Sequence, residues 1–100
     1  YEGGTMTRSL MSQVAETLLD IQGVQAAFVL ANSDTNETCI SARSSGAINV
    51  QAIMEKMHGG GHMTAAAMQR SKTNLKTVKA ELMNAIEEYR KEEDTNESDS

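Results

Sequence analysis

Three consecutive glycines between two histidines form the segment of this chain whose residue types are best suited to bind an anion. The segment reads His58-Gly59-Gly60-Gly61-His62. Glycine adopts positive φ at little cost, so successive N–H groups can converge on one point and form an anion-binding nest. The imidazole of His62 adds a donor at the exit of the turn. The spacing predicts a phosphate-binding turn, in which alanine at Gly60 is harmful if the φ there is positive.

An arginine upstream of the glycines, Arg43, is the second residue suited to phosphate. It lies in Ser41-Ala42-Arg43-Ser44, at the end of an expected strand and with hydroxyl groups on both sides. A guanidinium is a rigid fork of donors that matches phosphate oxygens. Arg43 and Gly59 are 16 positions apart, with one short helix expected between them. That connection could bring Arg43, Ser41 and Ser44 to the same edge of a sheet as the glycine turn.

Each of these residues also has a purely structural interpretation. A glycine run more often ends a helix than binds a ligand, and this one matches neither the P-loop nor the dinucleotide-binding spacing. His62 could cap a helix, His58 suits a helix end by its partial charge, and Arg43 could be an ordinary surface residue. A zinc site from His58, His62 and Cys39 lacks the paired spacing of known sites. We therefore expect no metal site within this chain.

The composition is that of one globular domain with an acidic end. The chain has 100 residues, 39% of them hydrophobic, and a single cysteine, which excludes an internal disulfide. From Glu87 onward there are seven acidic and two basic residues, whereas the preceding 86 residues contain seven of each. A neutral body argues against binding long nucleic acid through backbone charge. No apolar run approaches the roughly 20 residues that cross a bilayer, so we expect a cytoplasmic chain without membrane contact.

The pattern along the chain predicts a linker, one domain and a tail. Residues 1–6 contain two glycines and begin without methionine, so we expect a linker remnant of a longer protein. Residues 7–93 should form the domain. From Asp94 the composition is polar and acidic, which predicts a disordered tail over residues 94–100.

Within the domain, helical and strand periodicities alternate, which predicts an α/β (α+β) fold with a small mixed β-sheet and flanking helices. The two strands before residue 44 should pair as an antiparallel hairpin. Asn49 and Asn74 are expected helix N-caps. After His62 we expect one helical turn that runs into a short strand. The expected elements are a helix at 7–22, strands at 24–31 and 37–43, a helix at 49–57, a strand at 66–70 and a last helix from 74.

Three segments taken together resemble the DHHA1 domain, the second lobe of the DHH phosphoesterase superfamily. They are Ser41-Ala42-Arg43-Ser44, then Ile48-Asn49-Val50-Gln51-Ala52-Ile53-Met54, then Gly59-Gly60-Gly61-His62 with the alanines that follow. The resemblance covers residues 24–86. His58 and Ala67 stand where the wider family often has glycine. With Gln69 and the Asn-Val-Gln segment, these departures make the chain most similar to the cyclic di-AMP phosphodiesterases.

The resemblance implies a division of labour between two lobes. In such enzymes the first lobe supplies aspartates and histidines that hold two manganese ions, which activate water for phosphodiester cleavage. The second lobe binds the substrate, here through Arg43, the glycines and His62. This chain contains no Asp-His-His run. We therefore expect it to be catalytically silent when isolated, with the Mn²⁺ held by an upstream DHH domain.

The implied ligand is cyclic di-AMP or a related small phosphodiester. The implied partner is the DHH domain of a parent chain that is anchored in the cell membrane, with this domain facing the cytoplasm. Within the same superfamily, a short oligoribonucleotide or a single-stranded DNA end is an alternative substrate. A third interpretation is a non-catalytic interaction or dimerisation module, whose amphipathic last helix contacts a partner or a second copy. The sequence leaves these alternatives open.

Overall fold

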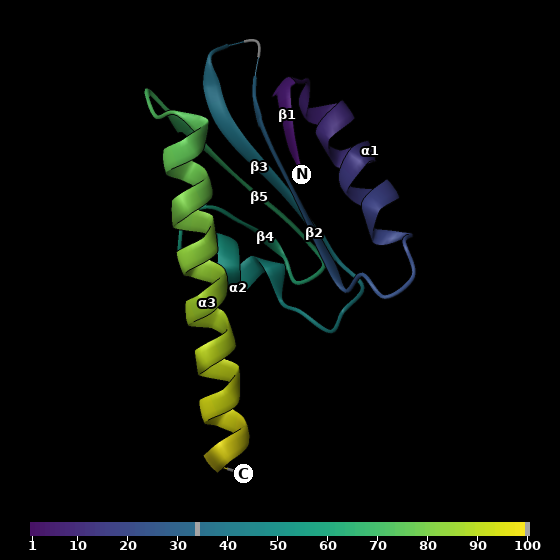
Figure 1. Ribbon diagram of the computed structural model, residues 1–100, viewed down its shortest axis with the longest axis vertical. Coiled ribbons are helices and arrows are strands. Elements are labelled where there is room, and N and C mark those ends of the chain that lie inside the picture. The colour runs from purple at the N-terminus through teal and green to yellow at the C-terminus, as the bar shows by residue number, and fades with distance from the viewer. Residues whose placement is uncertain (34, 100) are drawn as a thin grey trace.

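The computed structural model describes residues 1–33 and 35–99, and no side chain beyond Glu93 is described. Strands and helices follow one another along the whole chain (Figure 1). They are β1 (Glu2–Thr5), α1 (Arg8–Leu19), β2 (Ala26–Asn32), β3 (Glu37–Ser44), α2 (Val50–Glu55), β4 (Gly60–His62), β5 (Ala65–Ser71) and α3 (Leu75–Asp99). The predicted disordered tail at 94–100 lies outside the residues whose side chains are described.

The strands form one mixed sheet in the order β1-β2-β3-β5-β4. β1 runs parallel to β2, and the other neighbouring pairs are antiparallel. The β2–β3 hairpin has the predicted form and pairs Leu30 with Ile40 and Phe28 with Ala42. The predicted small mixed sheet with flanking helices is confirmed.

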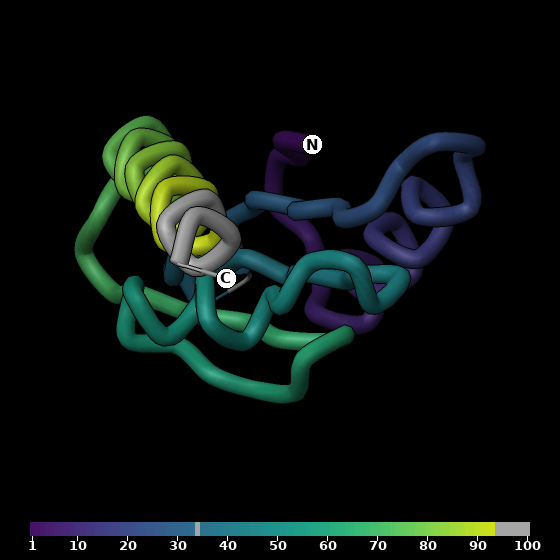
Figure 2. The backbone as a smooth tube through the Cα atoms, turned by 90° about the horizontal axis from the view of Figure 1, so that it is seen from below, coloured from purple at the N-terminus to yellow at the C-terminus, as the bar shows by residue number. Residues whose placement is uncertain are grey.

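The side chains of β3 alternate between two separate cores. Ile40 and Ala42 belong to the larger core, which contains buried residues of α2 and α3. Cys39 lies in the smaller core with Met11 and Ala15 of α1. α1 and α3 therefore cover opposite faces of the sheet, and the view from below separates them clearly (Figure 2).

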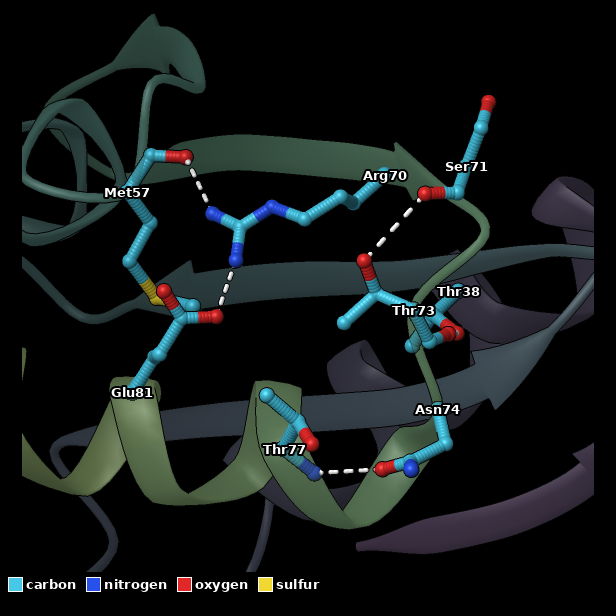
Figure 3. A network of polar contacts seen from close by, with 8 residues as sticks. All are labelled: Thr38, Met57, Arg70, Ser71, Thr73, Asn74, Thr77 and Glu81. Carbon is cyan, nitrogen blue, oxygen red and sulfur yellow. Dashed lines mark hydrogen bonds and ion pairs between the residues drawn. The ribbon is translucent and has the colours of Figure 1, made fainter.

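The predicted N-caps of the two later helices are confirmed. Asn49 Oδ1 accepts a hydrogen bond from the backbone N–H of Ala52 at 3.1 Å. Asn74 Oδ1 accepts one from the backbone N–H of Thr77 at 2.8 Å (Figure 3). Both bonds satisfy a donor that the first helical turn leaves without a partner.

A single guanidinium joins β5 to α3 and to the end of α2. Arg70 donates to the carboxylate of Glu81 and, at 3.2 Å, to the carbonyl oxygen of Met57 (Figure 3). Met57 directly precedes His58 and the glycine run. The contact therefore fixes the backbone from which the glycines depart.

Three predictions about local structure differ from the structure. Residues 1–6, predicted as a linker, contribute β1, where the Tyr1 carbonyl accepts from the N–H of Leu30 at 2.7 Å. This pairing satisfies backbone groups along the outer edge of β2. The glycine run contributes strand β4 rather than a turn, and residues 65–67 begin β5 rather than a helical turn.

None of the described helices is long and apolar enough to span a membrane.

Candidate functional site

A groove of about 590 Å³ lies between α1 and the β5–β4 end of the sheet. Its volume is within the range of pockets that bind small molecules. α1 contributes Arg8, Met11 and Ser12, and β3 contributes residues 39–41 and Arg43. The other walls come from residues 58–61 and 65–69. The structure thus brings Arg43, Ser41 and the three glycines to one cavity, as the sequence predicts.

The strand register explains why these residues meet. Arg43 is opposite Ala65, and Ala65 is in turn opposite His62. Directly opposed residues of antiparallel strands project from the same face, so these three form one row across the sheet. Neighbouring strands are about 4.8 Å apart, which puts the backbones of Arg43 and His62 roughly 10 Å apart.

The next row along the strands provides a floor of small residues. It consists of Ser41, Ala67 and Gly60, and it is followed by the pair Cys39 and Gln69. Ala67 and Gln69 are exposed. No long side chain therefore stands between the Arg43 end and the Gln69 end of this floor. A flat ligand could approach the backbone of β5 and β4 closely.

Arg43 is held in place by α1. Its Nη2 donates to Ser12 Oγ at 2.9 Å, and its Nη1 donates to the carbonyl oxygen of Ala42 at 2.8 Å. Its Nε lies 3.9 Å from Oε1 of Glu16, and 19% of the Arg43 side chain remains exposed. The guanidinium is thus oriented in advance, and its charge is only partly offset by a carboxylate that is itself 67% exposed.

The glycine run combines a helix end with an edge strand, which differs from the predicted nest. The N–H of Gly59 donates to the carbonyl oxygen of Met54 at 2.8 Å and closes α2. His58 has a left-handed φ of 65°, in the position where a helix commonly ends with glycine. Gly60 and Gly61 then pair with Ala67 and Ala66.

The three glycines differ in whether the surrounding structure leaves space for a side chain. A Cβ at Gly59 would lie 2.6 Å from Cβ of Met68, and one at Gly61 would lie 2.6 Å from the carbonyl oxygen of Ala65. Gly61 also has a φ of 143°. Gly60 has no atom within 4 Å of the Cβ position and is not among the glycines with positive φ. The condition under which alanine at Gly60 would cause strain is therefore not met.

The two predicted serines lie on opposite faces of β3. Ser41 is buried and lines the groove. Ser44 is displaced by an odd number of positions from Ser41, so it faces the other side of the sheet, and its Oγ accepts from the N–H of Gly46 at 3.0 Å. The structure therefore does not place Ser44 at the groove. His62 is exposed and is aligned with Arg43 by register, but it is not among the lining residues.

The cysteine and histidines do not form a metal site with one another. Within the described part of the chain, no three His, Cys, Asp or Glu side chains are grouped so that they could hold a metal ion. Cys39 is buried, and this burial raises the pKa of its thiol, while the charge of Arg8 partly opposes the shift. The thiol is therefore protonated at neutral pH and is not prepared to ligate zinc.

Sequence reasoning alone did not identify the contributions of α1 and Gln69 to the groove. Arg8, Ser12 and Glu16 are spaced at i, i+4 and i+8, so they form one polar stripe along α1. That stripe borders the apolar residues Met11 and Ala15. The spacing could have indicated a functional helix face. However, only the packing of α1 against β3 shows that the stripe borders Arg43.

The fold and the groove together define a small α+β domain with an open cavity lined by arginine and glycine. The sequence profile of the DHHA1 domain matches residues 2–92. The chain therefore belongs to the DHHA1 domain family, which confirms the resemblance found in the sequence. A solved structure, of an exopolyphosphatase-related protein from Bacteroides fragilis, has the same fold with a TM-score of 0.68 at 20% identity. The superposition covers 88% of this chain and 29% of that one.

Curated relatives are much longer than this chain. Cyclic-di-AMP phosphodiesterase GdpP of Bacillus subtilis (strain 168) is 46% identical over 80 residues, which are 80% of this chain and 12% of that protein. Cyclic-di-AMP phosphodiesterase PdeA of Listeria monocytogenes is 44% identical over 84 residues, which are 84% of this chain and 13% of that protein. A membrane protein–large ribosomal subunit bL9 fusion protein of Aster yellows witches'-broom phytoplasma is 52% identical over 87 residues, which are 86% of this chain and 10% of that protein. The chain thus spans about a tenth of the length of these relatives.

Proposed function

We propose that this chain is the substrate-binding lobe of a DHH-family phosphodiesterase that hydrolyses cyclic di-AMP or a related small phosphodiester. The observation that carries the proposal is the shared groove of Arg43 and the glycine run, with a floor of small side chains between them. The names of two relatives at 44–46% identity support the choice of substrate.

In this proposal the residues of the chain bind and orient the substrate. Arg43 donates to a phosphate oxygen from a position that Ser12 already fixes. Gly60 leaves the β4 side of the floor without a side chain, so that the ligand can lie against the backbone. His62, in the same row as Arg43, supplies a further donor at the same end. Ser41 completes the polar floor.

The hydrolytic chemistry belongs to another part of the parent protein. Two bound metal ions would activate water and neutralise the phosphate, and the described residues of this chain do not provide a ligand set for them. We infer that an upstream DHH domain holds them as Mn²⁺. We also infer that the parent is tethered to the cell membrane with this lobe on the cytoplasmic side, since one relative is named a membrane protein.

Calorimetric titration of the 100-residue chain with cyclic di-AMP tests the proposal. Replacing Arg43 by glutamine should weaken binding by about tenfold, because a charge-assisted bond to phosphate contributes roughly 1.5–3 kcal/mol. Arg90→Gln is the matched control, since Arg90 pairs with Glu87 and does not line the groove. Equal affinity of the Arg43→Gln variant and the wild type, or no binding by either, would contradict the proposal.

A further inference from the structure

Of the two arginines that line the groove, Arg8 is the one that has no carboxylate partner among the described residues. Ion pairs with glutamates are formed by Arg43, Lys56, Arg70, Lys79 and Arg90. Arg8 is exposed, lines the groove and has no such pair within the described chain. Its charge is therefore available to a ligand.

Arg8 and Arg43 belong to different parts of the same cavity. Arg43 is bonded to Ser12, and Ser12 lies one helical turn after Arg8 on α1. One turn corresponds to about 6 Å along the helix axis. On the sheet, Arg43 belongs to the row with Ala65. Arg8 is instead close enough to Cys39 for its charge to lower the pKa of that thiol, and Cys39 precedes Arg43 by four residues on β3. Four strand residues span roughly 14 Å.

The end of the groove near Arg8 has the polar character of a second contact site. Gln69 is exposed, lines the groove and is directly opposite Cys39 in the register. Its amide offers hydrogen-bond donors at the Cys39 end of the groove, the end on which the charge of Arg8 acts. Between this end and the Arg43 end lie only Ser41, Ala67 and Gly60 on the floor. Two separated groups of donors thus border one surface of small residues.

We propose that Arg8 is a second anion-binding residue and that the groove takes a ligand with two separate phosphate groups, one at Arg43 and one at Arg8. A dinucleotide is a ligand of this chemical class, because its two phosphates are separated by sugar and base atoms that the small floor can accommodate. The inference rests on the proposed function, since it assumes that Arg43 binds the first phosphate.

Titrations of the 100-residue chain with one-phosphate and two-phosphate ligands test this inference. Arg8→Gln should weaken binding of cyclic di-AMP by about fivefold, because an exposed charge-assisted contact is worth somewhat less than a buried one. The same variant should bind AMP as the wild type does. Arg8→Lys, which keeps the charge, should retain most of the affinity for cyclic di-AMP. Arg90→Gln should change neither ligand's affinity.

The outcomes separate the inference from the proposed function. If Arg8→Gln weakens the binding of AMP and of cyclic di-AMP equally, Arg8 contacts a phosphate that both ligands share, and the two-phosphate inference is wrong. If Arg8→Gln changes neither affinity while Arg43→Gln weakens both, the inference is wrong and the proposed function stands. If the wild-type chain binds neither ligand, both are overturned. Because Arg8 forms no ion pair with the described residues, the Arg8 variants should keep the wild-type circular dichroism spectrum.

Discussion

Small residues occur on both faces of the β5–β4 strand pair, but for different reasons. Toward α2, Ala66 and Met68 are buried, and the backbone of β5 approaches Gly59 and Gly61 so closely that no Cβ fits. On the other face, Ala67 is exposed and Gly60 has open space beside it. The first face is filled by the protein itself, whereas the second is the floor of the groove.

This difference indicates which small residues are required for packing and which are free to serve a ligand. Replacing a side chain on the packed face must displace backbone or core atoms, so the effect should appear in stability. Replacing one on the groove face displaces nothing in the described structure, so the effect should appear in binding. Variants at neighbouring positions can therefore separate the two roles within a single strand.

The largest expected effect is the loss of stability on adding a methyl group at Gly59 or Gly61. Both Gly59→Ala and Gly61→Ala should lower the free energy of unfolding by about 1–3 kcal/mol, because the new Cβ would meet β5 backbone and, at Gly61, strain the positive φ. Urea denaturation followed by circular dichroism measures this change.

Gly60→Ala is the matched control within the same run. Its Cβ meets no atom within 4 Å, and alanine is favoured over glycine in a strand by roughly 0.5–1 kcal/mol, so stability should be unchanged or slightly higher. Equal destabilisation by all three alanines would show that the backbone of β4 differs from the one described.

An effect of similar size is expected at Ala66 of β5, and a smaller one at its neighbour Ala67. Ala66→Leu should lower the free energy of unfolding by about 1–3 kcal/mol, because Ala66 is 3% exposed in a filled core. Ala67→Leu should change stability by no more than about 0.5 kcal/mol. However, it should obstruct the groove and weaken binding of cyclic di-AMP. If Ala67→Leu binds as the wild type does, the ligand does not lie on this floor.

The smallest expected effect concerns the carboxylate beside Arg43. Glu16→Gln removes the negative charge 3.9 Å from Nε of Arg43, so the affinity for cyclic di-AMP should rise by up to about twofold at low salt, as expected for an exposed pair. Titration in low and high salt checks this, with Glu87→Gln as the control on α3. Weaker binding after Glu16→Gln would mean that this glutamate orients Arg43 more than it offsets its charge.

Local patterns in the sequence predicted the elements that local chemistry determines. The β-hairpin before residue 44 was predictable, and Asn49 and Asn74 were recognisable as caps from their position before apolar periodic segments. The family was likewise predictable, since the Arg43 and glycine segments occur together in the correct order.

Features that depend on pairing between distant segments were not predictable in the same way. β1 and β4 contain glycines and have little strand propensity of their own, so they are strands only because the edges of β2 and β5 accept them. The same holds for the groove, where Ser12 meets Arg43, and Arg8 joins the lining, only after α1 packs on β3. For Ser44, by contrast, the alternation of the strand already implies the face opposite to that of Ser41.

The most direct test of the central claim is a ¹⁵N–¹H correlation spectrum of the chain titrated with cyclic di-AMP. If Arg43 and the glycine strand bind one ligand on the open face, the amide shifts should change around Arg43, residues 59–62, residues 65–69 and the first half of α1, while those of α3 stay constant. Changes centred on the α2–α3 face, or no changes at ligand concentrations up to the millimolar range, would contradict the account.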